Sequence, residues 1–128
     1  EIDIFENYGG EDGLEVNIQS HTIHFGESGE ETRGMIAKKT KVAKKGDTLF
    51  HIYACHWTEK FIAFYTDGKL IRTQKMSKNL AFWMNREMSI VINNGLEAKY
   101  LPKSSTTYLA NKMEIDWIRV YQKKAKLK

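Results

Sequence analysis

The stretch that decides the fold is residues 1–6, which read EIDIFE. Isoleucine and phenylalanine favour an extended strand, and alternate side chains of a strand share a face. We therefore expect Glu1 and Asp3 on one face, with Ile2 and Ile4 directed into a core. Glu6 joins the acidic face only if one extra residue forms a β-bulge around positions 4 and 5. The motif thus predicts a bulged strand that carries three carboxylates on one surface.

Such an acidic row indicates a function, because like charges side by side on a sheet destabilise the fold. A retaining glycosidase needs this arrangement. One carboxylate attacks the sugar carbon, another exchanges a proton with the glycosidic oxygen, and the two groups lie roughly 5–5.5 Å apart.

The motif resembles the signature of glycoside hydrolase family sixteen, in the laminarinase-like form that carries the bulge. Three later stretches recur in the family's order: TIHFG at residues 22–26, FHIYACHW at 50–57 leading to DG at 67–68, and IDWIRVY at 115–121. The resemblance implies a concanavalin-like β-jelly-roll sandwich that cleaves β-linked glucans or galactans from inside the polysaccharide chain. It covers nearly the whole sequence but only the second half of a family member.

The resemblance therefore implies that residues 1–128 are the C-terminal part of one catalytic domain. Its partners would be a polysaccharide substrate and the N-terminal half of the same domain, and its compartment would be extracellular or periplasmic. On this interpretation Glu1 marks a truncation or processing point. Residues 123–128 are expected to be a basic, frayed tail.

Roles for the three acids also follow from the resemblance. Glu1 would be the nucleophile that forms the glycosyl-enzyme. Glu6 would protonate the leaving oxygen and then deprotonate the incoming water. Asp3, between them, would tune their ionisation and steady the intermediate. No organic cofactor is required for this chemistry.

Four further residues match positions of interest in the family, each with a plainer alternative. His24 could hold a carboxylate or a sugar hydroxyl, or be a structural histidine at a strand end. Trp57 could stack on a sugar ring or pack in the core. Asn93 could contact sugar or only form a turn. Asp116 could help to hold a structural calcium ion, which needs about six or more oxygen ligands, or be a surface aspartate.

The patterning of apolar residues predicts an all-β fold, a sandwich or barrel, because short strands recur about every ten residues. No stretch shows a helical period. Asp67 and Gly68 between apolar runs predict a hairpin turn. The expected strands span residues 15–25, 35–43, 49–57, 61–65, 70–73, 88–93 and 113–122, with a polar loop at 75–79.

Length and composition exclude several classes of protein. A chain of 128 residues forms one domain at most, and no apolar run is long enough for a membrane helix. The single cysteine, Cys55, is expected to pack as a small hydrophobe. The net charge of +4 reflects basic stretches at 38–45 and 123–128, which carry no interleaved aromatics, so nucleic acid is not an expected partner. The four histidines lack the spacing of a zinc site, and His21 is expected to be structural.

The choice of substrate stays open at this point. β-1,3- or mixed β-1,3/1,4-glucan is the first choice, from the laminarinase-like motif. Agar or carrageenan galactans come second, favoured by the basic charge. A non-catalytic carbohydrate-binding β-sandwich and a structural β fragment that acts with another chain are the alternatives outside the enzyme class.

Overall fold

The structure, a computed structural model, describes residues 1–7, 18–26, 34–41, 50–95 and 112–123. It divides into two compact units, Glu1–Ile90 and Val91–Lys128, and each is described by itself. For residues 34–41 only the backbone is described.

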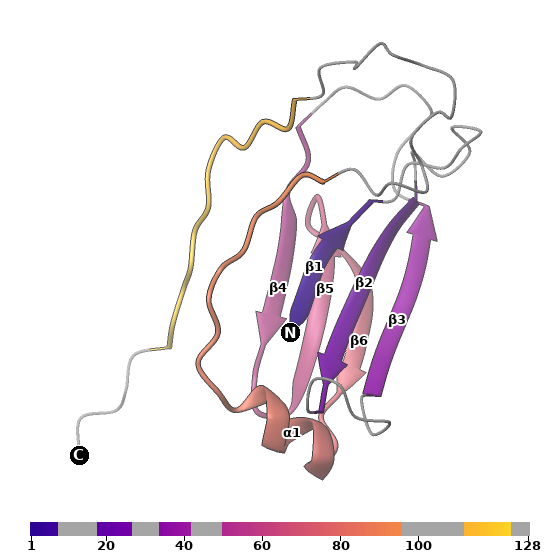
Figure 1. Cartoon of the computed structure of the whole chain (residues 1–128), viewed down its shortest axis with the longest axis vertical. Helices are drawn as coiled ribbons and strands as arrows, with labels where there is room; N and C mark the ends of the chain where they lie inside the picture. The colour runs from indigo at the N-terminus through magenta and orange to yellow at the C-terminus, as the bar shows by residue number, and fades with distance from the viewer. Residues whose placement is uncertain (8–17, 27–33, 42–49, 96–111, 124–128) are drawn as a thin grey trace. The chain divides into compact units, whose positions relative to one another are not determined.

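In its described residues, the first unit contains two three-stranded antiparallel sheets and one short helix (Figure 1). The strands of one sheet follow the order β1-β2-β3 and those of the other the order β4-β5-β6. The elements are β1 (Ile2–Glu6), β2 (Ile18–Phe25), β3 (Gly34–Lys41), β4 (Tyr53–Trp57), β5 (Phe61–Thr66), β6 (Lys69–Lys75) and α1 (Lys78–Met84). The predicted all-β class is confirmed.

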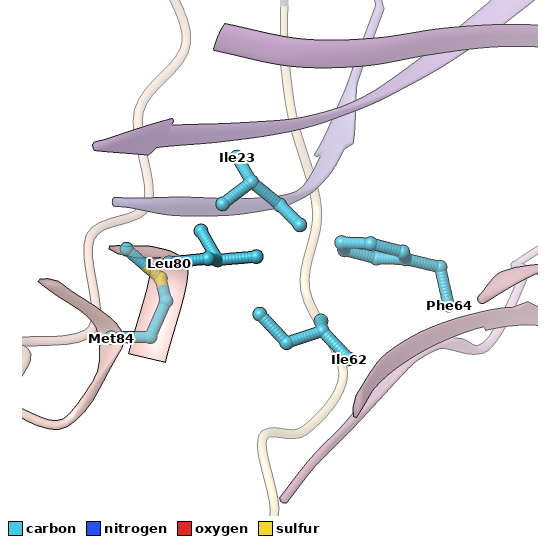
Figure 2. Packing of buried hydrophobic residues seen from close by; sticks show 5 residues of the cluster. All are labelled: Ile23, Ile62, Phe64, Leu80 and Met84. Atoms are coloured by element: carbon cyan, nitrogen blue, oxygen red, sulfur yellow. The ribbon is translucent and has the colours of Figure 1, made fainter. Parts of the chain in front are cut away.

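The core lies where β2, β5 and α1 meet. Figure 2 shows Ile23 from β2 pointing toward Ile62 and Phe64 of β5, with Leu80 and Met84 of α1 closing the cluster. All five side chains are fully or almost fully buried. Burying a side chain of this size contributes about 1.5–3 kcal/mol, so this cluster holds the two sheets together.

The hairpin between β5 and β6 turns at Asp67 and Gly68, as predicted. Both residues have positive φ, 49° and 76°. A two-residue turn of this hand matches the twist of the flanking strands, and aspartate and glycine tolerate it better than other residues. The turn residues in the sequence therefore set the register of this hairpin.

Cys55 behaves as the sequence predicts. Its side chain is partly buried and packs against the core cluster. Burial raises the pKa of the Cys55 thiol to about 11, because the thiolate loses hydration. The thiol is therefore protonated and weakly nucleophilic at neutral pH.

The expected absence of helix is wrong. Residues 78–84 form α1, which overlaps the end of the predicted polar loop. Ser77 caps the helix, since its side-chain oxygen accepts a hydrogen bond of 3.2 Å from the Leu80 amide. Leu80 and Met84, one turn apart, are the buried residues. Two apolar positions in seven residues are too few for a helical period to be recognised, but the serine before them was a usable signal.

The contribution of the Ser77 cap to the free energy of unfolding can be measured. Ser77→Ala is expected to lower the free energy of unfolding by about 1 kcal/mol, because the Leu80 amide loses its acceptor. Ser77→Asp is the matched control, since aspartate caps equally well. Urea denaturation of the three proteins checks this. An equal loss in both variants would mean that the cap is not the cause.

Two predicted strands are absent from the described residues. Residues 88–93 and 113–122 have no strand structure, and apolar side chains there are exposed, for example Val91 at 79% and Tyr121 at 83%. Alternating apolar residues favour a strand, but a strand also needs a neighbour that completes its hydrogen-bond ladder. Within the ranges that the structure describes, these segments have no such neighbour.

Candidate active site

The acidic motif forms β1, which pairs antiparallel with β2. The Glu1 nitrogen donates to the His24 carbonyl and the His24 amide donates to the Glu1 carbonyl, both at 3.0 Å. Asp3 then lies opposite Thr22, but Glu6 lies opposite Ser20. Three steps along β1 therefore match two along β2. This extra residue is the predicted β-bulge, and it is confirmed.

The bulge changes the direction of its own side chains. Ile2 packs against the core, as predicted, but Ile4 is 40% exposed, so its predicted burial is wrong. Ile4 lies in the bulge, where the alternation of faces breaks. Phe5, also at the bulge, stacks against Tyr53 of β4, with ring centroids 4.1 Å apart.

One face of β2 supplies polar side chains to the acids. Thr22 Oγ1 donates to Glu6 Oε2 at 2.6 Å, and the Ser20 and Thr22 hydroxyls are 3.3 Å apart. His24 Nε2 lies 3.3 Å from Asp3 Oδ2. These three residues alternate along β2 and therefore share a face, but only His24 was predicted to belong to the site. Thr22 lies two residues before His24 on the same face of the strand, and this spacing could have indicated its contact with Glu6.

Asp3 is the acid whose ionisation is most disturbed. Its pKa is raised to about 7, first by burial, then by the negative charges of Glu6 and Glu1. Asp3 Oδ2 is buried and, within the described part of the chain, accepts no well-aligned hydrogen bond. The neutral carboxyl is favoured because burial removes hydration from the anion and the two neighbouring carboxylates repel it, which outweighs the attraction of the positively charged Glu1 nitrogen. Asp3 therefore exchanges its proton close to neutral pH.

This raised pKa predicts a pH-dependent stability. Below about pH 4 the Asp3 carboxyl is neutral in both the folded and the unfolded chain, and the folded state has its full stability. This stability decreases as the pH rises through about 7, because the carboxyl ionises less readily in the folded state. Asp3→Asn, which cannot ionise, should therefore be more stable than wild type at pH 8. After allowance for solvent screening the gain is about 1–2 kcal/mol, and it should vanish near pH 3.5. Thermal unfolding at both pH values measures it. A difference independent of pH would contradict the assignment.

A hollow of about 250 Å³ adjoins Glu1 and His24. Its other wall comes from the end of α1 and the residues after it, including Trp83 and Arg86. The Arg86 guanidinium lies over the Trp83 ring, 4.7 Å from its centroid. An aromatic ring with a few polar groups is the usual lining of a small-molecule site. Trp83 was not predicted to belong to the site, because the helix that carries it was not predicted.

The remaining predicted residues lie elsewhere. Trp57 ends β4, is 42% exposed and does not line the hollow beside Glu1. Asn93 and Asp116 belong to the second unit, and both are exposed. Their roles in binding sugar and calcium stay predictions.

Two absences concern only the described residues. No group of three or more histidine, cysteine or acidic side chains there could hold a metal ion. No helix in the same ranges is long and apolar enough to cross a membrane. Residues 124–128, most of the predicted tail, lie outside the description.

Two of three comparisons with known proteins return a match. The model of the glycosyl hydrolases family 16 matches residues 1–119. A search of curated proteins returns no match. Among solved structures, the chain is similar to a Bacteroides ovatus protein described as a mixed linkage glucan PUL GH16 in complex with a G4G4G3G product. The identity is 26% and the TM-score 0.54, over 64% of this chain and 36% of that one.

The match to little more than a third of the solved chain agrees with the two three-stranded sheets, which form part of a jelly-roll sandwich. The family match covers most of the sequence, including the acidic motif and both sheets. The chain therefore belongs to glycosyl hydrolase family 16.

Proposed function

We propose that the protein is an endo-acting, retaining glycoside hydrolase that cleaves mixed β-1,3/1,4-glucan or β-1,3-glucan. The observation that carries the proposal is the bulge in β1, since it shifts Glu6 into the row begun by Glu1 and Asp3. Family membership supports the reaction class. The mixed-linkage product named for the similar Bacteroides ovatus structure supports the choice of glucan.

The first half of the reaction would form a covalent intermediate. Glu6 donates its proton to the glycosidic oxygen while the Glu1 carboxylate attacks the anomeric carbon, and the bond to the leaving sugar breaks. The Thr22 hydroxyl donates to Glu6 Oε2 and would help to orient the carboxyl group of Glu6 for this proton transfer.

The second half would return the enzyme to its starting state. Glu6, now ionised, takes a proton from water, and the resulting hydroxide attacks the anomeric carbon and releases Glu1. Two inversions give overall retention. Asp3 exchanges its proton close to neutral pH, so it can lower the negative charge beside Glu1 and Glu6 when both are ionised.

Sugar binding would use the hollow beside Glu1. Trp83 adds aromatic surface to the wall of this hollow, with the Arg86 guanidinium over its ring, and the polar groups of His24 and Arg86 would offer hydrogen bonds to sugar hydroxyls. We also propose that further strands of the sandwich are supplied by a preceding part of the domain, and that the protein acts outside the cytoplasm. Calcium at Asp116 and sugar contacts by Trp57 and Asn93 remain parts of this proposal.

A substrate panel tests the proposed function. Reducing-end release is measured on lichenan, laminarin, agarose and carrageenan, with this chain and with a form extended by the N-terminal half of a family domain. We expect release from lichenan or laminarin by the extended form. Release of reducing ends from agarose or carrageenan alone would show that the substrate is a galactan, the second candidate, and not a glucan. Binding to a glucan without release from any polymer would instead support a carbohydrate-binding module.

A further inference from the structure

His21 is a fully buried polar side chain on the core side of β2, the side opposite to Thr22 and His24. Gln19, two residues earlier, is also fully buried. Placing polar side chains in an apolar core costs free energy unless their hydrogen bonds are made. The hydrogen bonds of His21 and Gln19 therefore indicate the role of these two buried side chains.

The partners of His21 define its protonation. Nδ1 lies 2.7 Å from the Ile4 carbonyl oxygen, which can only accept, so Nδ1 carries a proton. Nε2 lies 2.9 Å from the side-chain nitrogen of Gln19, an arrangement that favours a ring without a proton on Nε2. Nδ1 is therefore the donor that His21 directs at the Ile4 carbonyl.

The second sheet holds this arrangement in place. The Gln19 amide nitrogen donates to Thr66 Oγ1 of β5 at 2.9 Å, and that hydroxyl lies 3.2 Å from Gln19 Oε1. The His21 ring stacks on Phe64 of β5, with centroids 4.8 Å apart. Arg72 of β6 donates to the His21 carbonyl at 3.0 Å. The imidazole is thus fixed by packing and by hydrogen bonds.

The acceptor of His21 is the bulge itself. The register places Asp3 opposite Thr22 and Glu6 opposite Ser20, so Ile4 lies in the part of β1 where the ladder is interrupted. A bulge leaves a backbone group without its ladder partner, and the group needs another. His21 supplies that partner to the Ile4 carbonyl.

We infer that His21 is a positioning residue for catalysis: by holding the Ile4 carbonyl it locks the bulge that brings Glu6 into the row with Glu1 and Asp3. The effect on catalysis rests on the proposed function. The bond itself does not, and it can be tested in a protein without activity. A carboxyl group displaced by about 1 Å can lower the rate roughly 10²-fold, so a support for the bulge has consequences for turnover.

The test compares three variants, with kcat and KM measured on the extended form well below each melting temperature. His21→Leu fills the space but cannot donate. His21→Asn can place its amide nitrogen where Nδ1 lies. Ile62→Ala removes a buried side chain that makes no bond to the bulge, and it serves as the control for lost stability.

We expect His21→Leu to lower kcat by roughly 10²-fold with little change in KM, because the ground-state contacts to sugar are kept. His21→Asn should recover most of this loss, and Ile62→Ala should keep the wild-type kcat although its melting temperature falls. If the three variants lose kcat in proportion to their loss of stability, the role is structural only and the inference is overturned.

A second measurement keeps the inference testable if His21→Leu does not fold. The ¹⁵N shifts of the His21 ring in wild type should show a protonated Nδ1 and an unprotonated Nε2 between pH 6 and 8. A proton on Nε2 alone would overturn the inference. If wild type releases no sugar from any polymer, the proposed function fails, while the ring shifts still decide whether His21 holds the bulge.

Discussion

Glu1→Gln is expected to lower turnover on mixed-linkage glucan by roughly 10⁴-fold or more, with the fold unchanged. The amide has nearly the shape of the carboxylate but is a very poor nucleophile, so the glycosyl-enzyme does not form. Glu1 lies at the start of β1 beside the hollow, and its backbone pairs with His24 through atoms that the substitution leaves intact.

Glu59→Gln is the control for Glu1→Gln, since Glu59 is exposed in the turn between β4 and β5 and makes the same change in charge. It should keep wild-type turnover. Initial rates of reducing-end release, with circular dichroism to verify folding, give the comparison. A folded Glu1→Gln protein that retains more than a few per cent of turnover would show that another group is the nucleophile.

Glu6→Gln has the second largest expected effect, and the size should depend on the leaving group. On natural glucan we expect a loss of roughly 10²–10⁴-fold, because the glycosidic oxygen must be protonated before it departs. In an aryl β-glucoside oligomer the leaving group is an acidic phenol, which departs as the phenolate without being protonated. On that substrate the formation of the glycosyl-enzyme should be nearly unaffected, and a burst of phenol should precede slow turnover.

This contrast separates the two carboxylates. Glu1→Gln should lose activity on both substrates, whereas Glu6→Gln should lose the first step only on the natural one. Thr22→Val, which removes the 2.6 Å hydrogen bond to Glu6 Oε2, should lower kcat while keeping KM close to wild type. If Glu6→Gln slowed the first step equally on both substrates, Glu6 would support the structure of the site and would not transfer a proton.

Local sequence signals predicted the elements that depend on few residues. The spacing of Glu1, Asp3 and Glu6 predicted a bulge, and the register of β1 against β2 contains it. Asp67 and Gly68 predicted a tight hairpin turn, and both residues have positive φ. In each case the backbone geometry follows from residues that are adjacent in the chain.

Features that depend on tertiary contacts were not predicted. The sequence at residues 88–93 and 113–122 has the alternation of strands, but pairing also needs a neighbour, which the sequence of these segments does not supply. Trp83 lines the hollow beside Glu1 because α1 packs its Leu80 and Met84 into the core, a placement that a seven-residue pattern does not reveal. His21 looked structural, and only its contact with the Ile4 carbonyl links it to the acid row.

The measurement that tests the central claim most directly is the anomeric configuration of the first product. Proton NMR during early hydrolysis of mixed-linkage glucan by the extended form distinguishes the two anomers before they interconvert. A nucleophile and an acid–base on one bulged strand predict retention, so the β-anomer should appear first and the α-anomer only by later mutarotation. The α-anomer as first product would mean inversion, and would contradict the role of Glu1 as nucleophile.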